Sequence, residues 1–200
     1  MAKIQIEIIG WNIHGGFENK WKERNFKNFL CTYDIICLSE CWIDKEFTMD
    51  DPDYKAYIFP RKSKSTQGGG SIILIKTEYT PYISVVESLY DTIIWLKLSK
   101  SLVKLQKDLF IAFTYLPPSN SVFFKENDVD LFFELEKHLC KYMDFGYVFL
   151  FGDFNSRTKN KPDYIENDAV HDSVSVLSYS NDDQLTERIN PDVGHNEYGS

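Results

Sequence analysis

The stretch YVFLFGDFNSRT, residues 147 to 158, begins like a buried strand and then turns abruptly polar. Its opening run of aromatic and aliphatic residues is typical of a strand in a sheet core. Gly152 follows, where the backbone can approach another group closely, and then come Asp153 and Asn155. Because side chains alternate along an extended segment, we expect Asp153 and Asn155 to project to one side. A carboxylate beside an amide suits phosphoryl chemistry, in which Asp153 deprotonates a water and Asn155 holds an oxygen on the phosphorus.

Earlier apolar segments have the same character, being short, β-branched or aromatic and bounded by turn residues. They are IQIEIIGWN (4–12), YDIICLSE (33–40), GGGSIILIK (68–76), TIIWLKLS (92–99) and LFIAFTYLPP (109–118). Together with residues 147–155 they predict six strands. Two helices are expected to cover the strands, over residues 20–30 and 128–143, and Asp128 is the predicted N-cap of the second.

The composition indicates a globular protein that is not a general nucleic-acid binder. Of the 200 residues, 43% are hydrophobic and 16% aromatic, enough to bury a sizeable core in one domain. The formal net charge of −8 argues against a module that holds nucleic acid mainly by releasing counterions. Any contact with a phosphate therefore requires local positive charge or a metal ion.

Cysteine usage and hydropathy bear on where the protein works. The four cysteines lack the paired spacing of zinc sites, which favours reduced, partly buried thiols. No window approaches the ~18 apolar residues of a membrane span, and the N-terminus has no long apolar signal region. We expect an intracellular protein, nuclear or cytoplasmic, that is not secreted and has no membrane partner.

Four of the predicted strands end in residues that can bind a metal ion or a phosphate. These endings are Asn12, Glu40, Tyr115, and Asp153 with Asn155. Taken singly, each has a simple structural explanation, such as a turn, a solvated strand end, a core tyrosine or a cap. Four such endings favour a shared site, because packed strands can bring their ends to one rim, where pockets tend to lie.

Five ordered blocks of sequence carry a family resemblance. They are WNIHG (11–15), LSECW (38–42), GGGSIILI (68–75), TYLPP (114–118) and GDFN (152–155). In this order and at these intervals they resemble the endonuclease/exonuclease/phosphatase superfamily, also called deoxyribonuclease I-like. Within it, YDIICLSECW and TYLPPSN are most similar to endonuclease domains of non-long-terminal-repeat retrotransposons, which nick target DNA for reverse transcription. The resemblance implies an α/β (α+β) fold, a two-layer β-sandwich of antiparallel and mixed sheets with helices on the outer faces.

The resemblance also implies a role for each strand-end residue. Glu40 would be the principal ligand of a divalent metal, Mg²⁺ or alternatively Mn²⁺, with Asn12 beside it. Tyr115 would hydrogen-bond the scissile phosphate or assist the leaving oxygen. Asp153 would orient or activate the attacking water, and Asn155 would stabilise the transition state. So sparse a ligand set agrees with Mg²⁺, which keeps waters and phosphate oxygens in its shell.

One signature of the superfamily, a Ser-Asp-His near the end of the domain, is not found. The histidines are His14, His138, His171 and His195, and none follows a Ser-Asp pair. His14 adjoins Asn12 at the proposed rim, whereas His171 is interpreted as a loop residue. We therefore expect residues 1–200 to be a single domain that is incomplete at its C-terminus, with the last strands missing.

The predicted function is a metal-dependent, DNA-nicking endonuclease that acts as a monomer. Arg61, Lys62 and Lys64 precede a strand and are candidates for contacting the DNA backbone, although a solvated turn also explains them. An inositol-phosphate or lipid phosphodiesterase of the same superfamily is one alternative, but the residues after GDFN match only part of its Asn-Tyr-Arg pattern. A catalytically dead remnant, with a binding role or none, is the other alternative.

Overall fold

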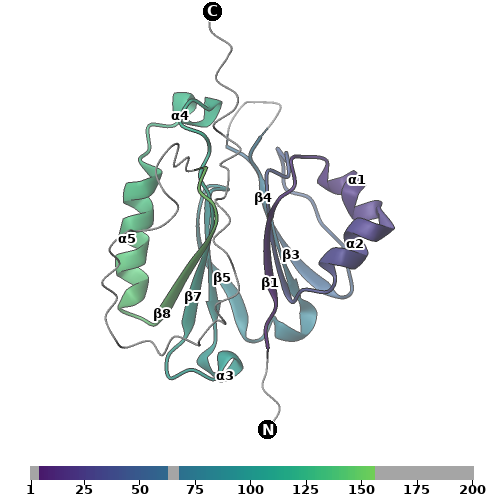
Figure 1. The fold of residues 1–200 in the computed structure, drawn as a ribbon, viewed down its shortest axis with the longest axis vertical. Helices are drawn as coiled ribbons and strands as arrows, with labels where there is room; N and C mark the ends of the chain where they lie inside the picture. Colours follow the sequence, from purple (N-terminus) through teal and green to yellow (C-terminus); the bar gives the residue numbers. More distant parts are fainter. Residues whose placement is uncertain (1–4, 63–67, 156–200) are drawn as a thin grey trace, which may run out of the picture. The chain divides into compact units, whose positions relative to one another are not determined.

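The computed structural model describes residues 5–62 and 68–155, which form two four-stranded sheets packed face to face (Figure 1). The first sheet has the order β1 (Ile8–Asn12), β2 (Ile35–Ser39), β4 (Ser71–Lys76), β3 (Tyr54–Phe59). The second has the order β5 (Ile83–Leu89), β6 (Ile93–Leu98), β7 (Leu109–Tyr115), β8 (Tyr147–Asp153). All six predicted strands are present, and the two-layer arrangement predicted for them is confirmed.

Each sheet contains one parallel pair, and the other pairs are antiparallel. In the first sheet β1 runs parallel to β2, with Asn12 opposite Ser39. In the second sheet β7 runs parallel to β8, with Tyr115 opposite Asp153. The two strands of a parallel pair end on the same side of their sheet, so each pair presents two adjacent carboxyl ends.

The strands β3 and β5 were not predicted from the sequence. Each lies at the edge of its sheet and is only partly buried, in contrast to β2, whose residues are all buried. The sequence of β5, ISVVESL, alternates buried and exposed positions and carries a glutamate. These two strands lack the long apolar run that revealed the six predicted strands.

The core lies between the two sheets, and alternating residues serve its two sides. Ile35 and Cys37 of β2 pack against residues of the second sheet such as Ile94. Ile36 and Leu38, on the other face of β2, belong to a separate cluster under the helices of the first sheet. This period of two is what a central strand covered on both faces requires.

Helices cover both outer faces, as predicted. The helix expected over residues 20–30 is divided into α1 (Phe17–Lys22) and α2 (Arg24–Leu30). The break occurs at Glu23, whose ψ of 119° leaves the helical region. The short elements η1 (Thr77–Tyr79), α3 (Lys100–Val103) and α4 (Val122–Glu126) connect strands.

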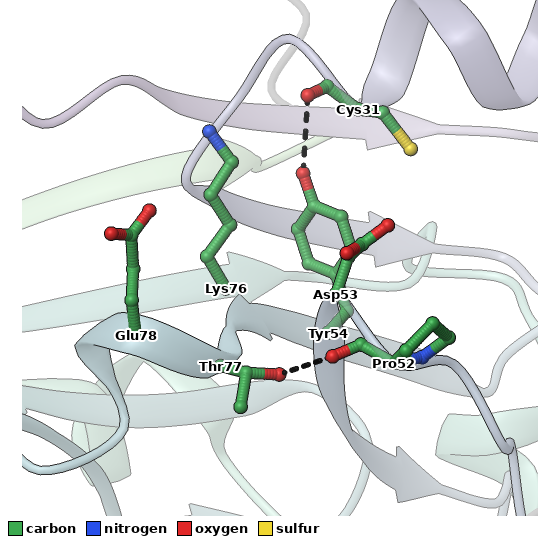
Figure 2. A pocket seen from close by; sticks show the side chains of 7 residues that line it. All are labelled: Cys31, Pro52, Asp53, Tyr54, Lys76, Thr77 and Glu78. Atoms are coloured by element: carbon green, nitrogen blue, oxygen red, sulfur yellow. Dashed lines mark hydrogen bonds between the residues drawn. The ribbon is translucent and has the colours of Figure 1, made fainter.

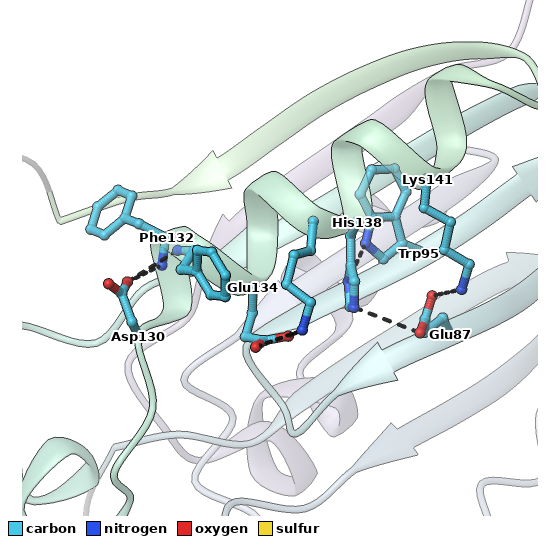
Figure 3. A network of polar contacts seen from close by, with 9 residues as sticks. Glu87, Trp95, Asp130, Phe132, Glu134, His138 and Lys141 are labelled. Carbon is cyan, nitrogen blue, oxygen red and sulfur yellow. Dashed lines mark hydrogen bonds and ion pairs between the residues drawn. The ribbon is translucent and has the colours of Figure 1, made fainter.

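The long helix α5 (Leu131–Met143) covers the second sheet and begins later than predicted. Its N-cap is Asp130 and not Asp128, because Oδ1 of Asp130 accepts hydrogen bonds from the backbone amides of the second and third helical residues, both at 3.0 Å. On the sheet side, Trp95 Nε1 donates to His138 Nδ1 at 3.1 Å, and Lys141 pairs with Glu87 of β5 (Figure 3). His138 is therefore a structural residue of this helix–sheet contact.

Every described residue belongs to one compact unit, Met1–Asn155. The second unit, Ser156–Ser200, lies outside the described residues, and so do His171 and His195. The expected single domain over 1–200, incomplete at its C-terminus, stays a prediction. Within the described unit all four cysteines are free, and none of its helices is long and apolar enough to cross a membrane.

Candidate active site

Polar side chains from the two sheets meet at one rim, formed by the carboxyl ends of β1, β2, β7 and β8. Asn12 Nδ2 donates to Asp153 Oδ2 at 3.1 Å, which joins β1 to β8. The Tyr115 hydroxyl donates to Glu40 Oε1 at 2.7 Å, which joins β7 to the end of β2. The structure thus brings together the four residues at which the predicted strands end. The register of the two parallel pairs places Asn12 beside Ser39 and Tyr115 beside Asp153, and the two hydrogen bonds join one pair to the other.

A third polar contact between the sheets lies next to these two, and sequence reasoning missed it. Asp91, in the turn between β5 and β6, accepts a hydrogen bond from the Gly70 amide through its carboxylate. Its backbone oxygen accepts from Ser71 Oγ at 2.7 Å. Asp91 belongs to no recognisable motif, and only the arrangement of the two sheets reveals that it faces β4.

Backbone strain concentrates at the rim. Of the six non-glycine residues with positive φ in the described part of the chain, five flank it: His14, Glu40, Trp42, Tyr90 and Asn155. Such conformations cost about 1 to 3 kcal/mol each and persist where the surrounding structure enforces them, most often at functional sites. The rim is therefore the region where this fold gives up stability for a particular arrangement of side chains.

The turn that carries Asp153 and Asn155 depends on Gly152. Its φ is 141°, and a Cβ there would lie 1.9 Å from the Thr114 carbonyl oxygen, so only glycine lets β8 run this close to β7. The strand then ends at Asp153, and Asn155 has a φ of 47°. The expectation that Asp153 and Asn155 lie on one extended segment is therefore wrong.

Instead, the two polar residues are joined by a local turn. Asp153 Oδ1 accepts from the Asn155 amide at 3.0 Å, as short polar side chains do in turns. Asn155 Nδ2 donates to the Leu116 carbonyl at 2.8 Å, which fixes the side chain against the end of β7. One amide hydrogen of Asn155 Nδ2 remains for another acceptor.

Tyr115 is buried, whereas its partner Glu40 is partly exposed. Burial, followed by the hydrogen bond to Glu40, raises the pKa of the Tyr115 hydroxyl, so that this group stays protonated and remains a donor. The Glu40 side chain is 17% exposed, and its other oxygen, Oε2, lies 3.5 Å from His14 Nδ1. His14 is 81% exposed and packs edge-on against Trp42. The carboxylate of Glu40 is thus reachable from the His14 side.

The donor set fits a hard divalent cation such as Mg²⁺. Among the described residues, Glu40, Asp91 and Asp153 form no salt bridge with any lysine or arginine, so no such cation occupies the carboxylates of the rim. Carboxylate and amide oxygens are the ligands that Mg²⁺ takes from proteins, together with waters. Residues 5–62 and 68–155 contain no cluster of three or more His, Cys, Asp or Glu side chains suited to a metal. A cation here would rely on Glu40, on Asn12 Oδ1 and on non-protein oxygens.

The predicted basic segment is only partly described. Lys64 lies outside the described residues. Arg61 has a side chain that is 10% exposed, with Nη2 3.9 Å from Asp44. Lys62 is exposed, and in the described part of the chain its side chain forms no salt bridge. Of the two described cations, Lys62 is the one available to an external phosphate.

A separate cavity of about 380 Å³ lies at the opposite end of the first sheet (Figure 2). Its lining includes Tyr54, whose hydroxyl donates to the Tyr33 carbonyl at 2.6 Å, and Lys76 at the far end of β4. The cavity contains none of the predicted site residues. It is therefore distinct from the rim.

Comparisons with known proteins identify the fold. No protein-family model and no curated protein matches the sequence. The AP endonuclease LMAP from Leishmania major superposes with a TM-score of 0.54 at 15% identity, over 75% of this chain and 55% of that one. The Xenopus laevis APE2 catalytic domain superposes with a TM-score of 0.52 at 17% identity, over 76% of this chain and 59% of that one. The chain has the deoxyribonuclease I-like fold.

This result confirms the predicted fold class, a two-layer sandwich with helices on its outer faces. The chain spans less than two thirds of the length of either deoxyribonuclease I-like structure. At these identities the likeness establishes the fold and not the activity. The case for an activity therefore depends on the rim itself.

Proposed function

We propose that this chain is a divalent-metal-dependent phosphodiester hydrolase that nicks DNA, similar to the endonuclease domains of non-long-terminal-repeat retrotransposons. The observation that carries the proposal is the pair of contacts Glu40–Tyr115 and Asn12–Asp153, which hold two un-neutralised carboxylates at one strained rim. One protein of the same fold is an AP endonuclease, which supports a nucleic-acid substrate. The five blocks of the family resemblance provide or flank these residues.

Glu40 and Asn12 would hold the cation, Mg²⁺ or Mn²⁺. When bound, such an ion polarises a phosphoryl oxygen and offsets the charge that develops on it. Glu40 is suited to this because its partner Tyr115 is neutral and leaves the carboxylate charge in place. Asn12 accepts the His14 amide at 3.1 Å through Oδ1, which keeps that oxygen oriented.

Asp153 would orient a water and take its proton. Both of its oxygens are fixed, Oδ2 by Asn12 Nδ2 and Oδ1 by the Asn155 amide. A base held in this way needs no reorganisation during the reaction. The remaining amide hydrogen of Asn155 is a donor for an oxygen of the phosphate, and the Tyr115 proton becomes a second donor when its hydrogen bond shifts from Glu40 to the phosphate.

The proposal is tested by nicking of supercoiled DNA with Mg²⁺, with Mn²⁺ and with EDTA. We expect the wild type to nick only with a divalent cation, and Glu40→Gln and Asp153→Ala to be inactive. Glu78→Gln is the matched control, because Glu78 is an exposed carboxylate at the opposite cavity. Nicking that persists in EDTA, or that Glu40→Gln leaves intact, would overturn the proposal.

A further inference from the structure

Asp91 is a buried carboxylate close to the candidate active site that the proposed reaction does not use. Its side chain accepts a hydrogen bond from the backbone amide of Gly70, the backbone amide and the positive charge of Lys62 both act to lower its pKa, and Asp91 as a whole is 3% exposed. Its second oxygen, Oδ1, is buried without a hydrogen-bond partner. Burying a charge in this way is costly, and groups that are kept despite such a cost are candidates for function.

The contacts of Asp91 connect the basic segment to the rim. Gly69 and Gly70, next to Asp91, accept backbone hydrogen bonds from Trp42 and Cys41 at 2.9 and 2.8 Å, directly after Glu40. On the other side, the Thr92 carbonyl accepts from the Tyr115 amide at 2.7 Å. Asp91 therefore lies between the strand that ends in Tyr115 and the segment that follows Glu40.

Lys62 is the exposed charged residue next to the Asp91 carboxylate. Its backbone amide and its positive charge both act on the pKa of the Asp91 carboxylate, while its side chain is exposed and makes no salt bridge with a described residue. Arg61 beside it turns inward, since its side chain is 10% exposed and its Nη1 is buried. A lysine whose side chain is exposed in this way presents its ammonium group to an external anion.

We propose that Asp91 is a positioning residue, whose carboxylate holds the Lys62 and Gly70 backbone so that the Lys62 ammonium meets a phosphate of the DNA strand beside Glu40 and Tyr115. The inference rests on the proposed nuclease function. It goes beyond that function because it assigns one phosphate contact to Lys62 and makes Asp91 the residue that positions Lys62 for this contact. Asp91 itself touches neither substrate nor metal.

The test compares Asp91→Asn, Lys62→Ala, the double variant and the wild type. The control is Asp108→Asn, because Asp108 also accepts a backbone amide, from Lys100 at 2.8 Å, but at the opposite end of the second sheet. Three quantities are measured: hydrogen exchange at the Lys62 and Gly70 amides, KM and kcat for supercoiled DNA, and the salt dependence of duplex binding.

For Asp91→Asn we expect exchange at the Lys62 and Gly70 amides to rise about tenfold, and KM to rise about fivefold with kcat within about twofold. The salt-dependence slope should fall by about one, as in Lys62→Ala, because one phosphate contact is lost. The double variant should bind no more weakly than Lys62→Ala alone, since the two residues act through one contact. Asp108→Asn should leave all three quantities unchanged.

Several results would overturn the inference. An unchanged KM in Asp91→Asn, despite faster exchange, would make Asp91 purely structural, and additive effects in the double variant would separate it from Lys62. If Asp91→Asn does not fold, Gly69→Ala replaces it, because its Cβ would lie 3.0 Å from Asp91 Oδ2 and disturb the same anchor. A wild type that neither binds nor nicks DNA removes the proposed function together with this inference, whereas a nicking wild type with unaffected variants removes the inference alone.

Discussion

Carboxylates at the two ends of the sandwich have different kinds of partner. At the rim, Glu40 is paired with the neutral hydroxyl of Tyr115 and Asp153 with the amide of Asn12. At the opposite end, Asp34 is paired with Lys76 at 2.7 Å, and Asp108 with a lysine of β6 at 2.9 Å. Charge is therefore neutralised at one end and retained at the other.

The backbone shows the same contrast. Five residues with positive φ flank the rim, whereas Lys104 is the sixth in the described part of the chain and merely ends the short helix α3. Ion pairs and regular backbone at the opposite end serve stability, whereas strain and retained charge at the rim oppose it. Retained carboxylates and a strained backbone are what the proposed site requires of the rim, and ion pairs are what a purely structural end of the sandwich requires.

The largest effect is expected from removing a rim carboxylate. Asp153→Asn keeps the shape of the side chain but removes the base, so nicking should fall by about 10³-fold. The free energy of unfolding should fall by only about 1 kcal/mol, because Asn can keep one of the two hydrogen bonds that Asp153 accepts and no ion pair is lost. Steady-state nicking and urea unfolding measure the two quantities, and a large loss of stability with activity retained would reverse the comparison.

The sequence alone located the rim residues because each follows a strongly apolar strand. Asn12, Glu40, Tyr115 and Asp153 carry that signal, and the strands they end were all predicted. The sequence did not predict which of these residues contact each other. The contacts join two sheets, and the alternation of side chains along a strand carries no information about how two sheets are placed. The sequence therefore predicted which residues meet at the rim but not which of them contact each other.

Other features were missed for identifiable physical reasons. Asp91 sits in a turn, where an aspartate is ordinary, and its burial depends on β4 of the other sheet. Asp128 and Asp130 are both acceptable N-caps, and only the amide contacts of α5 distinguish them. In both cases the local sequence permits more than one role for an aspartate, and tertiary packing determines which role it has.

The next effect concerns the strained backbone beside Asp153. In Gly152→Ala the new Cβ would collide with the Thr114 carbonyl, so β8 must move away from β7, and we expect a loss of about 3 kcal/mol in unfolding free energy. Activity should fall as well, because Asp153 moves with the strand. Gly16→Ala is the control: its φ is 69° but nothing lies within 4 Å of the new Cβ, so only about 1 kcal/mol should be lost. Equal losses in the two variants would contradict the close approach of β7 and β8.

A smaller effect is expected from breaking an ion pair at the opposite end. Lys76→Met leaves the buried Asp34 carboxylate with one backbone amide, from Glu7, and without its cation. We expect about 2 kcal/mol less stability in chemical unfolding, and unchanged nicking. The exposed Lys107→Met serves as the control for removing a positive charge. If nicking fell with stability in Lys76→Met, the two ends could not be separate in function.

The smallest effect concerns how stability changes with pH at the two ends. The backbone amide of Lys100, and then Lys97, lower the pKa of Asp108, so its stabilising contribution is present above the unfolded pKa of about 3.9 and is lost as the pH falls through the folded value. Burial raises the pKa of Asp91, so its contribution is complete below about 3.9 and is lost as the pH rises through the folded value.

Substituting each aspartate should therefore give opposite pH dependences. Asp108→Asn should cost more stability at pH ~7 than at pH ~3, and Asp91→Asn should cost more at pH ~3 than at pH ~7. Urea unfolding of both variants and the wild type across this range measures the differences. Because each comparison is made against the wild type at the same pH, the titration of all other groups cancels to first order. If the stability lost in Asp91→Asn and in Asp108→Asn changed with pH in the same direction, the Asp91 carboxylate would be compensated by its surroundings as well as that of Asp108. The contrast between the two ends of the sandwich would then not include Asp91.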